Sequence, residues 1–376
     1  MSQALYLDHA ATSPLRPEAR DAFLHASDMG GNPSSVHSLG RKAKVRMEDA
    51  RASILRALNA TGAAGLVFTA GGTEANALAL NQARDFDYVV VSEGEHDSIY
   101  AGASVVGKPV QHMPLMANGT ADLDALEALL DKQTGRAFVC LMLANNETGV
   151  VSDVARAAAI VAAHGGWLHV DAVQALGKID IDFSALGADS ISISAHKVGG
   201  GQGIGALVYN RDRTIRPLII GGGQELGLRA GTENVPGIVA FAAAVEASGP
   251  VDPAVSAAQA EVENKLKALG VTILGEGGHR VPGLLNIAQP HWASNLQLIH
   301  MDMAGICVSS GSACSSGKVK ASRVVAAMGR PDLADKVLRI SAGWTTKSDD
   351  WQRFYDVWST GYDNYLKRHA REKELS

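Results

Sequence analysis

Short apolar segments alternate with segments of helical periodicity between about residues 45 and 245. Strands are expected over 66–69, 88–92, 138–143, 167–170, 191–194 and 205–209, and helices over 46–58, 74–83, 123–130 and 154–164. A regular alternation of strand and helix is typical of parallel strands joined by helical crossovers. The sequence therefore predicts an α/β fold in which helices cover a mostly parallel central sheet.

This pattern changes near residues 246–252, where Gly, Pro and Asp indicate a linker. Helices are expected beyond it over 257–269, 295–304, 322–328 and 349–369, and strands over 271–274, 283–288, 306–309 and 337–341. We therefore expect a large domain over 15–245 and a smaller α+β domain made of 1–14 and 246–376.

Composition excludes several classes of protein. The chain has 376 residues, 46% of them hydrophobic, enough to bury a sizeable core. The net charge of −5 and the lack of a basic stripe argue against direct binding of nucleic acid. The twelve histidines form no closely spaced pair and no CxxC occurs, so a metal site has little support.

The cysteines and the N-terminus indicate a location. Cys140, Cys307 and Cys314 are too few for a disulfide framework and fit a reducing compartment. We recognise no signal peptide, and no apolar run reaches the roughly 18 residues that a membrane helix needs. We expect a cytoplasmic protein with no membrane partner.

A cluster of polar residues ends the strand expected over 191–194. Ser194, His196 and Lys197 stand there, and Val198 and three glycines follow. Open α/β sheets place their ligand sites at the carboxyl ends of strands. A lysine held there, near phosphate-binding groups, can carry an aldehyde cofactor as a Schiff base. On this stretch alone, a surface lysine in a glycine-rich turn explains the pattern equally well.

Other strand ends carry groups that suit such a cofactor. Gly72 and Thr73 open a helix, where backbone N–H groups and a hydroxyl can bind an anion, although an ordinary turn has the same appearance. Asp171 could pair with the pyridinium nitrogen of pyridoxal phosphate, or simply cap a helix. Gln174 could donate to the phenolate oxygen of that ring.

His96 and Asn146 follow two further strands. His96 could stack on a ring and move protons, although a lone histidine is often only structural or solvated. Asn146 could reach a ring substituent.

Cys314 differs from Cys140, which stands in an apolar strand and is expected to be inert core. Cys314 lies among Ser and Gly, with Lys318 and Lys320 nearby to favour the thiolate. A loop over 309–322 could carry it on the order of 20 Å. That suits a nucleophile that collects a group in one pocket and delivers it elsewhere; a harmless exposed cysteine is the alternative.

Ten ordered segments together carry a resemblance that spans nearly the whole chain. They cover 6–12, 31–37, 69–76, 95–96, 145–149, 169–174, 194–197, 229–234, 309–316 and 338–341. The chain resembles the cysteine desulfurases of the NifS/IscS type, within the class V aminotransferase superfamily of fold-type I pyridoxal phosphate enzymes. The Ser-Ser-Gly-Ser-Ala-Cys sequence at 309–314 resembles the group with the longer cysteine loop.

The resemblance implies a role for each matching residue. The phosphate of pyridoxal 5'-phosphate would be held by Gly72, Thr73, Ser194 and His196, and by Thr232 of the other subunit of a homodimer. The ring would be held by Lys197 as Schiff base, Asp171 at the pyridinium, His96 stacked on it, and Asn146 and Gln174 at its substituents. Arg339 would hold the substrate carboxylate in a pocket with Asn32 and His37.

The implied activity is removal of sulfur from L-cysteine, which gives L-alanine and a persulfide on Cys314 for a protein acceptor such as an iron–sulfur scaffold. A selenocysteine lyase, an aminotransferase and a non-catalytic sulfur carrier remain as alternatives. The chain departs from the family pattern at Asn295, His300 and Trp344.

Overall fold

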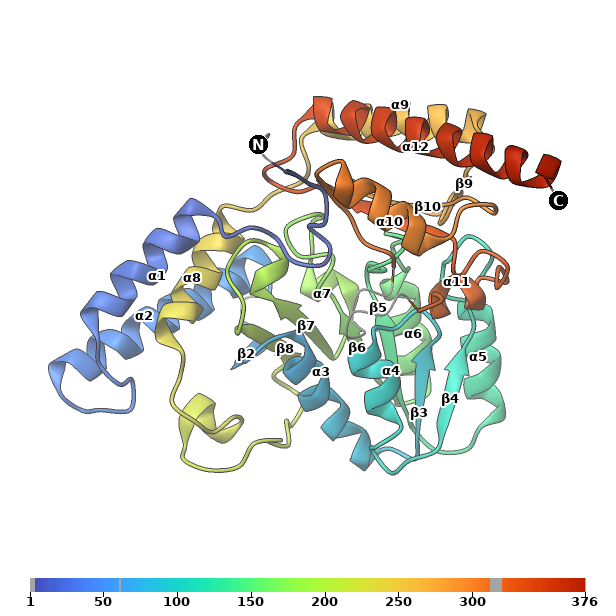
Figure 1. Cartoon of the computed structure of the whole chain (residues 1–376). Helices are drawn as coiled ribbons and strands as arrows, with labels where there is room; N and C mark the ends of the chain where they lie inside the picture. The colour runs from blue at the N-terminus through green and yellow to red at the C-terminus, as the bar shows by residue number, and fades with distance from the viewer. Residues whose placement is uncertain (1–3, 61, 312–319, 376) are drawn as a thin grey trace.

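The computed structural model describes residues 4–60, 62–311 and 320–375. Its centre is a seven-stranded sheet with the order β2-β8-β7-β6-β5-β3-β4 (Figure 1). The strands are β2 Ala64–Thr69, β3 Tyr88–Ser92, β4 Val110–Met113, β5 Ala137–Met142, β6 Trp167–Asp171, β7 Ser190–Ser194 and β8 Gly205–Asn210. Only β8 runs antiparallel to its neighbours β7 and β2, so the expected mostly parallel sheet is confirmed.

Helices cover both faces of this sheet, because successive side chains of a strand point to opposite faces. Val90 of β3 packs in the same core cluster as residues of α2, α5, α6 and α8. Its neighbours Val89 and Val91 pack instead with residues of α3 and α4. The bounds are α2 Ser38–Ala57, α3 Gly72–Leu80, α4 Asp97–Ala103, α5 Leu123–Lys132, α6 Val154–Ala163 and α8 Val235–Glu246. The fold is therefore a helix–sheet–helix sandwich, as expected for fold-type I.

The C-terminal part has its own sheet and core. β9 Thr272–Ile273, β10 Leu284–Ala288 and β12 Val337–Ser341 form an antiparallel sheet. Its helices are α9 Pro253–Ala268, α10 Ser294–Met303, α11 Arg323–Ala327 and α12 Ser348–Leu375, and α9 and α12 lie side by side (Figure 1). The large aromatic residues Trp351, Phe354 and Trp358 fill the core beneath α12.

The N-terminal residues belong to this C-terminal core in packing. β1 Leu5–Tyr6 pairs in parallel with β11 Ile306–Cys307. Leu5 and Leu7 are buried in the same cluster as Trp351. The chain then passes from this cluster toward the end of β7, where the backbone N–H of Ser13 donates to the carbonyl of His196.

The structure also corrects the predicted elements. The helix expected from residue 46 begins at Ser38, because His37 caps it by accepting the backbone N–H of Gly40. α1 Pro17–Met29, α4, β4, the short α7 Phe183–Leu186 and α8 were not predicted. Within the described part of the chain, no helix is both long and apolar enough to cross a membrane.

The three departures from the family pattern lie in the C-terminal part, and Trp344 lines a second cavity together with Lys197. Trp344 donates its indole N–H to the carbonyl of Pro14 and lies under the guanidinium of Arg16. His300, in α10, hydrogen-bonds to the carbonyl of Val357 in α12 at 3.0 Å. Asn295 also lies in α10.

Candidate active site

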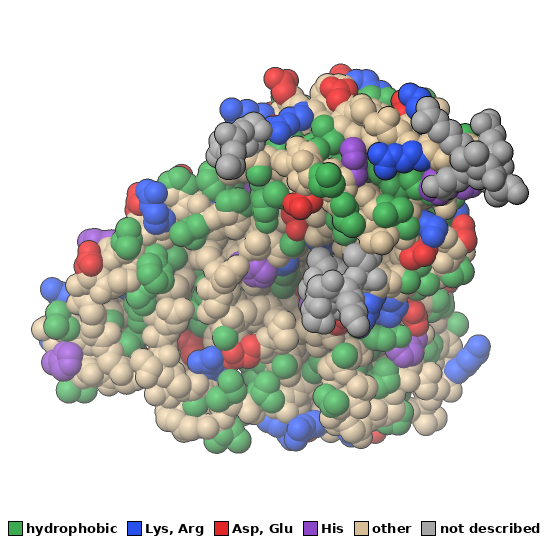
Figure 2. All heavy atoms as spheres, viewed as in Figure 1, with side chains coloured by type: hydrophobic (Ala, Val, Ile, Leu, Met, Phe, Trp, Pro, Cys, Tyr) green, Lys and Arg blue, Asp and Glu red, His purple; other side chains and the backbone are tan. Residues whose placement is uncertain are grey.

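A cavity of about 650 Å³ opens where the carboxyl ends of β5, β6 and β7 meet the C-terminal part. Figure 2 shows a hollow in this face, between the sheet-bearing part below and the C-terminal part above. Nine predicted residues line the cavity from the sheet-bearing part: Gly72, Thr73, His96, Asn146, Asp171, Gln174, Ser194, His196 and Lys197. Arg339 lines it from β12, so both parts of the chain contribute.

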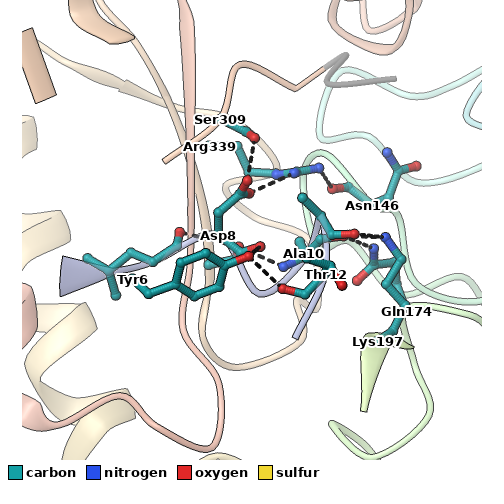
Figure 3. A network of polar contacts seen from close by, with 12 residues as sticks. Tyr6, Asp8, Ala10, Thr12, Asn146, Gln174, Lys197, Ser309 and Arg339 are labelled. Carbon is teal, nitrogen blue, oxygen red and sulfur yellow. Dashed lines mark hydrogen bonds and ion pairs between the residues drawn. The ribbon is translucent and has the colours of Figure 1, made fainter. Parts of the chain in front are cut away.

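Lys197 ends a 3₁₀ turn, Ala195–Lys197, that directly follows β7. Its Nζ donates to the carbonyls of Ala10 and Ala11, at 2.7 Å each (Figure 3). His196 contacts the hydroxyl of Thr12 through Nδ1. Burial and, to a smaller extent, the charges of Lys197 and Lys178 lower the pKa of His196 to about 4. At neutral pH His196 is therefore uncharged and has one ring N–H to donate.

Asp171 is the last residue of β6 and is only 3% exposed. One carboxylate oxygen accepts the amide of Asn76 at 2.8 Å and the other accepts the backbone N–H of Val173 at 3.0 Å. None of the ion pairs among the described residues includes Asp171. A buried carboxylate without a cationic partner is expected where a cationic ligand group binds.

A chain of buried side chains fixes Asp171 from behind. The Asn76 amide donates to Asp171, so its oxygen faces Nε2 of His169, which must then carry the proton. Nδ1 of His169 accepts the Ser190 hydroxyl at 2.9 Å. Burial lowers the pKa of His169 to about 3, so it stays neutral. Asn76 and His169 were not predicted from the sequence.

The same amide of Asn76 also supports His96. It donates to the Ser98 hydroxyl at 2.8 Å, and that hydroxyl lies 2.9 Å from Nδ1 of His96. His96 caps α4, because Nδ1 accepts the backbone N–H of Ser98. The ring is therefore held in one orientation at the cavity wall, with its remaining proton on Nε2.

The turn into α3 and the end of β7 form the candidate anion site. α3 begins at Gly72, where a Cβ atom would lie 2.9 Å from the side chain of Val173, so only glycine fits. The hydroxyl of Ser194 is buried and has no hydrogen-bond partner among the described residues. A helix N-terminus beside an unpaired donor suits a phosphate.

Arg339 is buried on β12, with its side chain 3% exposed. Nη1 donates to the carbonyl of Asn146 at 2.9 Å, and Nη2 pairs with Asp8 at 3.1 Å (Figure 3). The Gln174 amide donates to the carbonyl of Ala10 at 2.7 Å. Arg339, Lys197 and Asp171 all line the cavity, so a guanidinium and a primary amine share it with the buried carboxylate.

Comparison with known proteins assigns the family. A family model described as aminotransferase class-V matches residues 5–354. The chain is 34% identical to a cysteine desulfurase IscS of Dictyoglomus turgidum, over 95% of this chain and 94% of that relative. It is 37% identical to a cysteine desulfurase of Cereibacter sphaeroides, over 92% and 93% of the two chains. This chain is a member of the cysteine desulfurase family.

Solved structures agree with this assignment. A NifS-like protein of Rickettsia africae superposes with a TM-score of 0.89 at 35% identity, over 96% of this chain and all of that one. A structure described as SspA in complex with cysteine superposes with a TM-score of 0.78 at 28% identity, over 90% and 98% of the two chains. The expected fold-type I architecture of the desulfurases is thus confirmed.

Three predicted residues that the structure describes, Asn32, His37 and Thr232, do not line the cavity. Asn32 and His37 are exposed; Asn32 accepts the backbone N–H of Ser34, and His37 caps α2. Thr232 is also exposed. Cys314 and Lys318 lie outside the described residues, but Gly311 and Lys320 on either side of that segment both line the cavity.

The cavity also contains residues that the sequence analysis missed. Glu147 is buried beside Gly311 and accepts the hydroxyl of Ser322 at 2.5 Å, so it touches both flanks of the Cys314 segment. Burial raises the pKa of its carboxyl, against the lowering effect of Ser322 and the nearby arginines.

The desulfurase family consists of pyridoxal phosphate enzymes. Asp171, which forms no ion pair among the described residues, and Ser194, whose hydroxyl has no partner there, fit that cofactor.

Proposed function

We propose that this protein uses pyridoxal 5'-phosphate to take sulfur from L-cysteine, releasing L-alanine and leaving a persulfide on Cys314. One observation carries the proposal: the buried, unpaired carboxylate of Asp171 shares a cavity with the amine of Lys197 and with both flanks of the Cys314 segment. An aminotransferase would have no use for a cysteine at that place.

The residues present suit the cofactor group by group. We assign the phosphate to Gly72, Thr73, Ser194 and His196, and the ring to Asp171, His96, Asn146, Gln174 and Lys197. When bound, the cofactor takes up the electron pair that the departing α-proton leaves on the substrate. Asp171 keeps the ring nitrogen protonated, and Asn76 with His169 holds Asp171 in place.

Lys197 would move the α-proton. Once its Nζ is released, the carbonyls of Ala10 and Ala11 would accept hydrogen bonds from it and keep it beside the substrate. Arg339 would bind the substrate carboxylate through its cavity side. The Cys314 thiolate would attack the substrate sulfur, forming an S–S bond as the C–S bond breaks, and the bonding pair stays with the carbon that becomes the methyl group of alanine.

We further propose a homodimer in which Thr232 completes the phosphate site of the other subunit. The segment before Thr232 exposes large apolar side chains, including Ile220 at 84% and Leu226 at 88%. We also propose that Asn32 and His37 line the substrate pocket with Arg339. A protein such as an iron–sulfur scaffold would then take the sulfur.

Two further predictions stand. The large domain would span 15–245 and the small domain 1–14 with 246–376, and the protein would be cytoplasmic.

The test is mass spectrometry of the protein after incubation with L-cysteine, together with alanine release. We expect a mass gain of one sulfur atom on the peptide that contains Cys314. Cys314→Ser should lose both the mass gain and alanine release. In Lys197→Ala, sodium borohydride should no longer attach the cofactor covalently to the protein. Full cysteine turnover by Cys314→Ser would contradict the desulfurase mechanism. Selenocysteine turnover that this substitution leaves unchanged, with negligible turnover of cysteine, would instead favour a selenocysteine lyase.

A further inference from the structure

Behind Arg339, on the side away from the cavity, lies a carboxylate that the sequence analysis did not single out. Asp8 Oδ1 pairs with Nη2 of Arg339 at 3.1 Å, and Asp8 Oδ2 accepts the hydroxyl of Ser309 at 2.8 Å (Figure 3). Arg339 and Asn146 line the cavity, whereas Asp8 does not. We propose that Asp8 is a positioning residue for the substrate carboxylate: it holds Arg339 from behind and leaves the cavity side of the guanidinium for the ligand.

The backbone around Asp8 is fixed by the C-terminal part. Asp8 forms a parallel bridge with Ser341, and the backbone N–H of His9 donates to the carbonyl of Ser341. On the other side, Leu7 donates to the carbonyl of Cys307. Asp8 is thus held between β11 and β12, and β12 is the strand that carries Arg339. A carboxylate anchored in this way can hold the arginine in one orientation.

Charge explains why Arg339 needs this partner. A buried guanidinium without a counter-charge destabilises the folded state strongly. The side chains of Arg339 and Asp8 are only 3% and 17% exposed, so water screens the pair little. Asp8 therefore supplies the counter-charge for the buried guanidinium of Arg339 before substrate arrives.

The guanidinium can hold two carboxylates at once. It has five N–H donors, of which the described contacts use one on Nη1 and one on Nη2. Its Nε is buried and has no partner among the described residues. A ligand carboxylate can thus accept hydrogen bonds from other N–H groups of Arg339 without displacing Asp8. Because Asp8 already fixes the guanidinium, these groups need no reorientation when the ligand binds.

This inference rests on the proposed role of Arg339, and the experiment separates the two. Steady-state kinetics of the holoenzyme should show that Asp8→Ala raises KM for L-cysteine by about tenfold or more, as expected for loss of a charge-assisted contact. We expect kcat to change by less than about threefold. Asp8→Asn, which keeps an oxygen acceptor but not the charge, should lie between wild type and Asp8→Ala. Calorimetry with L-alanine should show the same order of affinities.

Two comparisons decide the origin of the effect. Tyr6→Phe removes a hydroxyl that contacts the backbone of Asp8 and Thr12 but leaves the Asp8 carboxylate, so it should leave KM within about twofold of wild type. In an Arg339→Ala background, Asp8→Ala should raise KM no further; Arg339→Lys serves as the background if the alanine variant does not fold.

Unchanged KM and L-alanine affinity in Asp8→Ala would overturn the inference. So would an equal rise in KM in Tyr6→Phe, because the placement of the N-terminal segment would then be the cause. If Arg339→Ala or Arg339→Lys itself left KM unchanged, the carboxylate site in the proposed function would fail. If either raised KM while Asp8→Ala did not, only the role of Asp8 would fail.

Discussion

The ammonium group of Lys178 donates a 2.6 Å hydrogen bond to the side-chain oxygen of Gln174. A lysine can only donate, so this contact turns the Gln174 amide nitrogen toward the carbonyl of Ala10. Lys178 thus orients a residue that we assign to the cofactor ring. Burial and, to a smaller extent, the charges of Lys197 and Arg339 lower the pKa of Lys178 to about 7.

We expect Lys178→Met to change how stability depends on pH. The folded protein loses the Lys178 proton near pH 7, whereas the unfolded chain keeps it until about pH 10.5, the ordinary lysine value. The folded state therefore binds fewer protons between these values, and the free energy of unfolding rises with pH in this window. Urea unfolding at pH 7 and pH 9.5 should show a steeper rise for wild type than for Lys178→Met. Equal slopes would mean that Lys178 does not titrate there.

His169 should contribute to acid sensitivity. Its pKa is lowered to about 3 in the folded protein, so only the unfolded chain takes up this proton as the pH falls below 6.5. The stability from neutral His169 is thus present above pH 6.5 and is lost progressively toward pH 3. By pH 5 the loss is about 2 kcal/mol.

His169→Gln keeps hydrogen-bonding groups but cannot be protonated, so it should lose less stability than wild type between pH 7 and pH 5. Chemical denaturation at the two pH values measures this difference. A variant at exposed His25 is the matched control and should behave as wild type. An identical loss in His169→Gln and wild type would assign the acid sensitivity to another group.

Gly311→Ala should disturb the support of the Cys314 segment. A Cβ atom there would lie 2.3 Å from Oε2 of Glu147, so the carboxyl must move away from Ser322. Overpacking of this kind costs about 1–3 kcal/mol. We expect a lower thermal midpoint and slower persulfide formation. Gly249→Ala, where a Cβ meets nothing within 4 Å, is the control, and equal effects in both variants would contradict the role of Glu147.

The exposed apolar residues before Thr232 should be required for dimerisation. We expect the pair Ile220→Asp and Leu226→Asp to shift the protein toward monomer in sedimentation velocity, because it places charges on a surface that the dimer would bury. Loss of Thr232 from the phosphate site should then weaken cofactor retention. Met303→Asp, equally exposed but on α10, should leave both unchanged. A dimer that withstands both aspartates would place the interface elsewhere.

The sequence predicts the central strands well and the peripheral elements poorly. β3 and β12 have the predicted bounds, since each is a continuous buried run between turn residues. β4 was missed because it is an edge strand in which only Met113 is buried. α8 is apolar on nearly every side, so it shows little helical periodicity, although Asn234 and Pro236 mark its start.

Site residues that stand at or just after the end of a predicted strand, such as Asp171 and Lys197, could be predicted from the sequence. Asp8 and Asn76 were missed because their partners lie 331 and 95 positions away, and such contacts leave no pattern in the sequence. His169 could have been found, since it stands two residues before Asp171 and so shares its face of β6.

The N-terminal segment has a consequence for synthesis of the chain. Ala10 contacts Lys197 from 187 positions away, and Asp8 is placed by partners 301 and 331 positions later. Contacts between such distant positions form late in folding. The segment around Asp8 and Ala10 therefore cannot complete the cavity until β12 has been synthesised. A chain that stops before β12 would contain Lys197 but would not hold its carbonyl acceptors in place, so the surroundings of the catalytic lysine are complete only once the C-terminal sheet has formed.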